Sequence, residues 1–172
     1  MSLKPRLWYG VVLNLILAAL LISGAAIYVA YFRDSPGLGK NRILEIKKSG
    51  SGKIYGKWPL ENDGEFAVEF VHSVNQDTIR ETFKAEGRMI RPVAVRFSSF
   101  GAGVLSDLTE GQVLSRDKDG MLITGFTASF KELNYIVGTV SDHLLFINDE
   151  TLSLRDLCGK NAHITLRIRE EF

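Results

Sequence analysis

A histidine and a glutamate interrupt two neighbouring strand-like patterns in the middle of this 172-residue chain. In residues 66–72 every second side chain is apolar until the row ends in His72, and in residues 79–85 the same period places Glu81 in an apolar row. If the two segments form an antiparallel hairpin with a four-residue loop, His72 pairs with Ile79 and lies diagonal to Glu81. A charged group in an apolar row needs a partner, and the two side chains are then close enough to provide one.

These residues also suggest hydrolase chemistry, in which a carboxylate orients a histidine and the histidine activates a serine. The alternation places Ser73 on the face opposite His72, so Ser99 would have to supply the hydroxyl. The chain has no Gly-x-Ser-x-Gly turn of the kind that exposes a nucleophilic serine. We therefore interpret His72 and Glu81 as a structural hydrogen-bonded pair and assign no catalytic residue.

His72, Glu81 and His143 also form a chemically reasonable set of zinc ligands, since imidazole and carboxylate groups are common in zinc sites. No two of them have the short spacing of a zinc motif, so neither a metal nor another cofactor is expected. His143 follows a predicted hairpin turn, where its ring would be solvated or would cap nearby backbone. Cys158 is the single cysteine and cannot form an internal disulfide, so we interpret it as a partly buried turn residue.

A loop with almost no side chains, Gly101-Ala102-Gly103, follows the third strand-like segment, residues 89–100. Period two places Val93 on the same face of this segment as Val95 and Phe97. The N–H groups of the loop can form an anion-binding concavity, and the alternative is a bulge or a tight bend at a sheet corner. The candidate ligand-binding residues, which are polar or lack a large side chain near these features, are His72, Ser73, Glu81, Ser99, Gly101, Ala102, Gly103 and His143.

Short strands separated by turn-forming residues make up the rest of the chain after residue 42. No segment there keeps a helical period over three turns. The pattern predicts an all-β fold, either an antiparallel β-sandwich or a partly open barrel, with one N-terminal transmembrane helix. The further predicted strands are residues 43–47, 53–58, 112–115, 121–130, 135–140, 144–147, 151–154 and 162–168.

The predicted transmembrane helix is residues 7–32, which contain no charged side chain and exceed the roughly 20 apolar residues that cross a bilayer. A cleaved signal peptide is the alternative, because residues 23–26 are small enough for a cleavage site. We favour a retained anchor, since the apolar run is longer than a signal core and continues past residue 26.

The basic residues Lys4 and Arg6 precede this run, so the positive-inside rule places the N-terminus in the cytoplasm. The predicted organisation is a cytoplasmic N-terminus (1–6), an anchor (7–32), a linker (33–42) and an extracytoplasmic β-domain (43–172). This predicts a single-pass protein of the inner (cytoplasmic) membrane, with the domain in the periplasm or outside the cell. The net charge of +1 gives no electrostatic reason to expect a nucleic-acid partner.

Several short motifs occur in one order along the domain: His72-Ser73-Val74, Glu81-Thr82-Phe83, residues 97–103, Val137-Gly138-Thr139 and Asp142-His143-Leu144. In these motifs the chain resembles a bacterial family, domain of unknown function 1850, over most of the domain. Members of that family resemble small exported or membrane-anchored proteins, often encoded beside TRAP-type transporters that use a TAXI-class solute-binding protein. The resemblance implies a location and a partner, and no established activity.

Two classes of function follow from these observations. The first is a non-enzymatic accessory module, anchored in the membrane through residues 7–32, that contacts a TRAP-type permease or its solute-binding protein. The second is a small-ligand or metal-binding domain, or a hydrolase-like enzyme, with its site around His72, Glu81 and the loop Gly101-Ala102-Gly103. A ligand site should be concave with these polar groups converging, whereas a contact module should present a flat or protruding surface.

Overall fold

The computed structural model describes residues 41–171, apart from residue 62, residues 73–75 and residues 99–107. The predicted N-terminus, the anchor and nearly all of the linker lie outside these residues. Across the described ranges, no helix combines the length and the apolar character that a membrane span requires.

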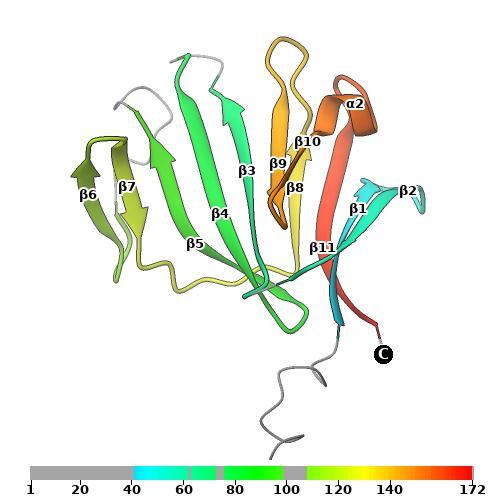
Figure 1. Ribbon diagram of the computed structural model, residues 1–172, viewed down its shortest axis with the longest axis horizontal. Coiled ribbons are helices and arrows are strands. Elements are labelled where there is room, and N and C mark those ends of the chain that lie inside the picture. Colours follow the sequence, from blue (N-terminus) through cyan, green and yellow to red (C-terminus); the bar gives the residue numbers. More distant parts are fainter. Residues whose placement is uncertain (1–40, 62, 73–75, 99–107, 172) are drawn as a thin grey trace, which may run out of the picture. The chain divides into compact units, whose positions relative to one another are not determined.

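Two antiparallel sheets make up the domain (Figure 1). The larger sheet has the order β10-β9-β3-β4-β5-β7-β6, and the smaller has the order β2-β1-β11-β8. The strands of the larger sheet are β3 (Glu65–Val71), β4 (Thr78–Glu86), β5 (Met89–Phe97), β6 (Val113–Asp117), β7 (Gly120–Thr124), β9 (His143–Ile147) and β10 (Glu150–Ser153). Those of the smaller sheet are β1 (Asn41–Lys48), β2 (Ile54–Pro59), β8 (Glu132–Ile136) and β11 (His163–Glu171), and a short helix, α2 (Leu154–Cys158), follows β10.

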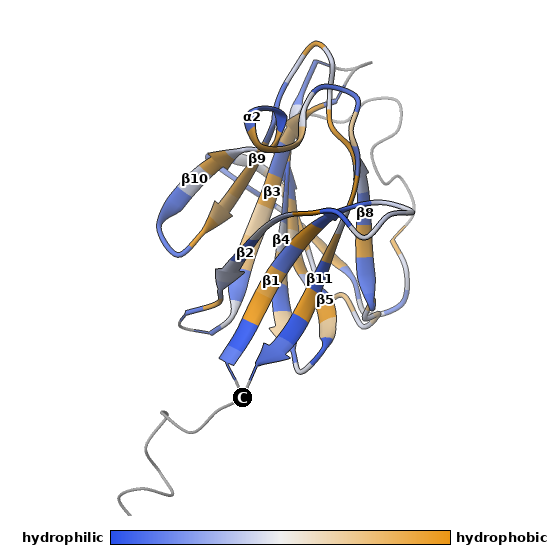
Figure 2. Cartoon of the chain, turned by 90° about the vertical axis from the view of Figure 1, so that its right-hand side faces the viewer, coloured by the Kyte–Doolittle hydropathy of each residue, from blue (hydrophilic) through white to orange (hydrophobic). Residues whose placement is uncertain are grey.

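The core lies between the inner faces of the two sheets. Apolar and polar residues alternate along β1 and β11 (Figure 2), which places Leu44 and Leu166 on the inner face. They pack in one cluster with Val68 and Leu145 from the larger sheet. The prediction of an all-β, antiparallel domain is confirmed, and the two sheets do not close into a barrel.

A second apolar cluster extends the inner face of the larger sheet under β4, β5 and β7. It is built on Ile79, Phe97 and Ile123, and Phe70 packs against both clusters. Because neighbouring strands contribute one buried residue each, the cluster holds this half of the sheet in register.

A bulge between β4 and β5 corrects the predicted face of Val93. Thr82 pairs with Ala94 and Phe83 pairs with Pro92, so Val93 is the extra residue and does not share a continuous row with Val95. Pro92 has no N–H to donate to the ladder, and proline within a sheet is tolerated at bulges and edges.

Several element boundaries also differ from the sequence prediction, and one helix is new. β8 begins at Glu132, three residues before the predicted start, and β7 ends at Thr124 instead of residue 130. The helix α2 was not predicted, although Ser153 caps it by accepting a hydrogen bond from the Asp156 N–H at 3.0 Å. A helix of five residues is too short to show a helical period, so only its capping serine marks it in the sequence.

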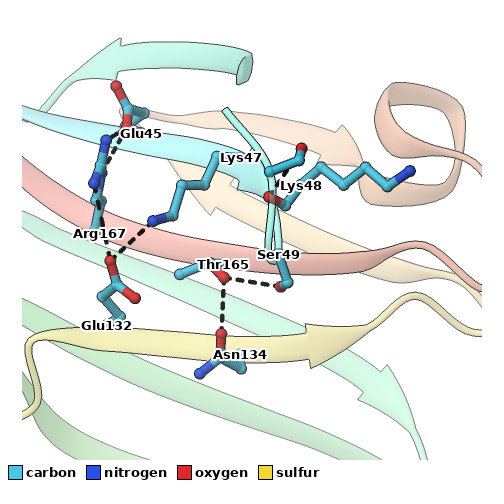
Figure 3. Close-up of polar contacts among 9 residues, drawn as sticks. Glu45, Lys47, Lys48, Ser49, Glu132, Asn134, Thr165 and Arg167 are labelled. Atoms are coloured by element: carbon cyan, nitrogen blue, oxygen red, sulfur yellow. Dashed lines mark hydrogen bonds and ion pairs between the residues drawn. The ribbon is translucent and has the colours of Figure 1, made fainter. Parts of the chain in front are cut away.

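A polar network covers the outer face of the smaller sheet (Figure 3). Glu45 is only 2% exposed, and the Arg167 guanidinium donates to it through Nε at 2.6 Å and Nη2 at 2.5 Å. Glu132 lies on the other side of this guanidinium at 3.9 Å and pairs with Lys47 at 3.1 Å. The buried carboxylate is therefore neutralised by a cation of the neighbouring strand, which a buried charge requires.

Candidate functional site

The hairpin of β3 and β4 holds Glu81 within β4 and His72 directly after β3. Phe70 pairs with Ile79 and Val68 pairs with Glu81, so the predicted pairing of His72 with Ile79 is wrong by two residues. His72 instead lies opposite Asp77, whose carbonyl accepts the His72 N–H at 2.7 Å. A two-residue shift leaves every side chain on its predicted face, which is why the shared inner row is confirmed although the register is not.

Glu81 is bonded to a tyrosine of the other sheet and not to the predicted histidine. The Tyr135 hydroxyl donates to Glu81 Oε2 at 2.6 Å. Glu81 lies four positions along the chain from Asp77, the residue opposite His72, a distance of roughly 13 Å along a strand. Burial raises the pKa of Glu81, and the hydrogen bond from Tyr135 opposes that rise. Burial and the neighbouring carboxylate also raise the pKa of Tyr135 well above its usual value.

His143 belongs to the same cluster, on the strand that flanks β3. It is the register partner of Phe70, and the two rings stack with centroids 5.0 Å apart and an angle of 12°. Tyr135 meets both rings edge-on, at 6.5 Å from Phe70 and 6.1 Å from His143. Glu81, Tyr135, Phe70 and His143 are thus continuous in space, although they come from four strands of the two sheets.

A backbone hydrogen bond sets the protonation of the His143 ring. The Gly138 N–H donates to Nδ1 at 3.2 Å, so Nδ1 is an acceptor and the neutral ring carries its proton on Nε2. Burial lowers the pKa of His143, and the charge of Asp142 partly opposes this effect. Capping of nearby backbone, one of the two predicted roles for this histidine, is therefore observed. The predicted hairpin turn before it is wrong, because β8 and β9 belong to different sheets.

The loop of residues 138–142 is tied to elements on both of its sides. The Ser141 hydroxyl donates to the Val71 carbonyl at 3.4 Å, at the end of β3. The Asp142 carboxylate accepts the Arg155 N–H at 3.1 Å and the hydroxyl of Ser153, the residue that caps α2. Arg155 in turn donates through Nη2 to the Val140 carbonyl at 3.1 Å. The loop is therefore held as a fixed wall between β3 and α2.

A pocket of about 300 Å³ lies between this loop and the end of β3. Its described lining residues are Phe70, Val71, His72, Gly138, Thr139, Val140, Ser141 and His143. The Nδ1 atom of His72 is buried and has no hydrogen-bond partner among the described residues. The structure thus brings two of the candidate residues, His72 and His143, to one concave site, while Glu81 is not among the lining residues and lies behind it beside Tyr135.

A buried aspartate beside His72 was missed in the sequence. Asp77 is 5% exposed and accepts hydrogen bonds from the N–H of Ser98, at 3.0 Å, and from the Ser98 hydroxyl. This contact joins the start of β4 to the end of β5, next to the two ranges that the structure does not describe. An aspartate at the end of a polar turn is the only sequence feature that marks it.

The candidates Ser73, Ser99, Gly101, Ala102 and Gly103 lie outside the described residues.

Metal binding and a reactive thiol are the remaining chemical possibilities. No group of three or more histidine, cysteine, aspartate or glutamate side chains is arranged there to hold a metal ion. Cys158 is partly buried at the end of α2, and burial raises the pKa of its thiol to about 11, so the thiolate form is scarce at neutral pH.

These features define a class of protein, an all-β domain of two antiparallel sheets with a small histidine-containing pocket at the end of β3 and the start of β9. Residues 66–154 match the family described as a domain of unknown function (DUF1850). The match covers just over half of the chain, and the protein belongs to that family. The matched range, residues 66–154, includes every described residue that lines the pocket. No curated protein and no solved structure matches the chain.

The raised pKa of Glu81 predicts a pH dependence of stability. A carboxyl with a higher pKa in the folded than in the unfolded protein binds more protons when folded, so stability falls as pH rises from about 4.5 through the raised value. Glu81→Gln keeps an oxygen that accepts from Tyr135 and cannot ionise. We expect this variant to unfold at a higher denaturant concentration than the wild type at neutral pH, with the difference vanishing below pH 4.5. Denaturation series at several pH values test this, and a wild type that is more stable at neutral pH contradicts it.

Proposed function

We propose that this protein is a membrane-tethered accessory domain of a TRAP-type transporter, and that it binds a small ligand in the pocket between β3 and the loop of residues 138–142. The observation that carries the binding role is the convergence of His72 and His143 on one concave site. Ligand sites combine an apolar lining with a few convergent polar groups, and this pocket has that composition.

The geometry supports binding more than catalysis. The described polar groups next to the pocket are already engaged: Glu81 by Tyr135, and Asp142 by Ser153 and Arg155. An orienting acid for either histidine is therefore not supplied by these carboxylates, whereas a base that activates a nucleophile needs one. A pocket with fixed walls and imidazole nitrogens that no described residue engages is suited to hold a ligand.

The transporter partner is supported by the resemblance described above and by the uncharged run of residues 7–32. A linker of about ten residues spans at most about 35 Å, so a domain behind such an anchor stays close to the membrane surface. A partner must then be embedded in the membrane or dock on it, as a permease and its solute-binding protein do.

Deletion of the gene, followed by measurement of solute uptake and permease abundance, tests this proposal. We expect loss of most of the uptake carried by the neighbouring TRAP-type transporter. Complementation with the wild type and with His163→Phe should restore uptake, because His163 is exposed on β11 and does not line the pocket. Complementation with His143→Phe should not restore it.

Two results would contradict the proposal. Parental uptake and permease abundance in the deletion strain would remove the transporter role. Turnover of a substrate by the purified protein, lost in His72→Phe and kept in His163→Phe, would replace it with the hydrolase-like alternative.

A further inference from the structure

The lining of the pocket is unusual for a chain with 20 acidic residues. Among its described lining residues none is an aspartate, glutamate, lysine or arginine, and the polar side chains are two imidazoles and two hydroxyls. A larger pocket of about 510 Å³ on the same sheet is lined by Glu61, Asp63, Glu65, Asp149 and Glu150 together with Arg80. A small anion is therefore disfavoured at the larger pocket and meets no carboxylate at the described lining of the smaller one.

The His143 ring supplies a hydrogen-bond donor of fixed identity. Its Nδ1 is occupied by the Gly138 N–H, which leaves the proton on Nε2, and no hydrogen bond among the described residues uses Nε2. The stack on Phe70 and the edge contact with Tyr135 hold the ring plane. A donor that is fixed in direction before binding costs little conformational entropy when it meets an acceptor.

The second imidazole adds a polar atom that the protein leaves unpaired. Nδ1 of His72 is buried without a partner among the described residues, and a buried polar atom in this state destabilises the protein. A ligand that pairs with Nδ1 removes this cost. The ring can donate through Nδ1 when the proton is there, so both imidazoles can present N–H groups to one acceptor.

A cation lies behind the loop wall. Arg155 donates to the Val140 carbonyl at 3.1 Å, and its Nε atom is buried without a partner among the described residues. The nearest acidic group of the loop, Asp142, is held by Ser153 and the Arg155 N–H. The charges of Asp142 and Arg155 shift the pKa of His143 in opposite directions, so the cation offsets part of the negative charge beside the pocket.

We propose that the pocket binds a small organic carboxylate, whose oxygens accept hydrogen bonds from His143 and His72 while its apolar part lies against Val71 and Val140. Val140 is 93% exposed and lines the pocket, which gives an apolar chain a surface to cover. The pocket volume of about 300 Å³ equals that of roughly ten water molecules, enough for a short-chain acid. This assignment deepens the proposed binding role by naming the ligand class for the same pocket.

Nitrogen-15 spectra of the histidine rings in the full-length protein in detergent test the assignment, since the chain has only three histidines. Butyrate is the probe, butyramide the uncharged control of the same shape, and sodium chloride the control for ionic strength. We expect saturable shifts of His143 and His72 with butyrate, none at His163, and none with butyramide or sodium chloride. Equal shifts with butyramide, or no saturable shift with butyrate, overturn the assignment.

Variants provide a second measurement. His143→Phe keeps an aromatic ring against Phe70 and removes the donor, so butyrate affinity should fall by about ten-fold or more. His163→Phe should bind like the wild type, and unchanged affinity in His143→Phe overturns the assignment. Loss of uptake in the deletion strain without butyrate binding would reject the ligand class alone. Butyrate binding with normal uptake would reject the transporter role alone.

Discussion

Arg167→Ala should destabilise the domain by about 3–5 kcal/mol, the usual effect of removing one partner of a buried ion pair. The carboxylate of Glu45 is 2% exposed and receives both Nε and Nη2 of this guanidinium, so truncation leaves a buried negative charge without its cation. Lys47 is engaged with Glu132 at 3.1 Å and is not free to replace the arginine. The unfolding midpoint in urea measures this effect.

An exposed ion pair on the same sheet provides the matched control. Lys57 and Glu171 are 3.1 Å apart with side chains 43% and 53% exposed, so Lys57→Ala should cost less than about 1 kcal/mol. Replacing both Glu45 and Arg167 by leucine should recover much of the stability lost in Arg167→Ala, because no charge then remains buried. If Arg167→Ala costs no more than Lys57→Ala, Glu45 is solvated in solution and the interpretation fails.

The sequence predicted the inner faces of the hairpin well and its register badly, for one physical reason. The period of two in residues 66–72 and 79–85 depends only on which side chains are buried, and burial is the stronger constraint. The pairing of Phe70 with Ile79 instead of His72 with Ile79 changes no face, so the hydrophobic pattern cannot choose between them. The length of the turn sets the register of the hairpin, and a run of polar residues specifies that length only weakly.

No local pattern in the sequence predicts the contacts between the two sheets. Tyr135 is 54 residues from Glu81 and belongs to the other sheet, so no spacing rule connects the two side chains. No spacing rule connects His72 with His143 either, although both were candidate residues of one ligand site. Their convergence depends on β9 pairing with β3, a crossover that the chain order does not reveal.

Gly138, the glycine of the pocket wall, occupies its position for a steric reason. A Cβ atom on Gly138 would overlap the carbonyl oxygen of Ser141 and would lie 3.5 Å from Nδ1 of His143. Backbone is the obstacle, so the turn itself has to open for any larger residue. The requirement arises from a contact three residues along the chain and becomes visible only in the folded loop.

Gly138→Ala should therefore destabilise the domain by about 1–3 kcal/mol, the range for overpacking against a part that cannot move freely. Opening the turn also pulls the Gly138 N–H away from Nδ1 of His143. Nitrogen-15 spectra should then show that His143 no longer has a single Nε2–H tautomer. The affinity for butyrate should fall by about ten-fold or more. Gly52→Ala is the matched control, because a Cβ there meets nothing within 4 Å, and its effect should stay within about 0.5 kcal/mol. A Gly138→Ala protein that keeps the wild-type tautomer and the wild-type affinity would show that the loop does not orient His143. The ring would then be positioned by Phe70 and Tyr135 alone.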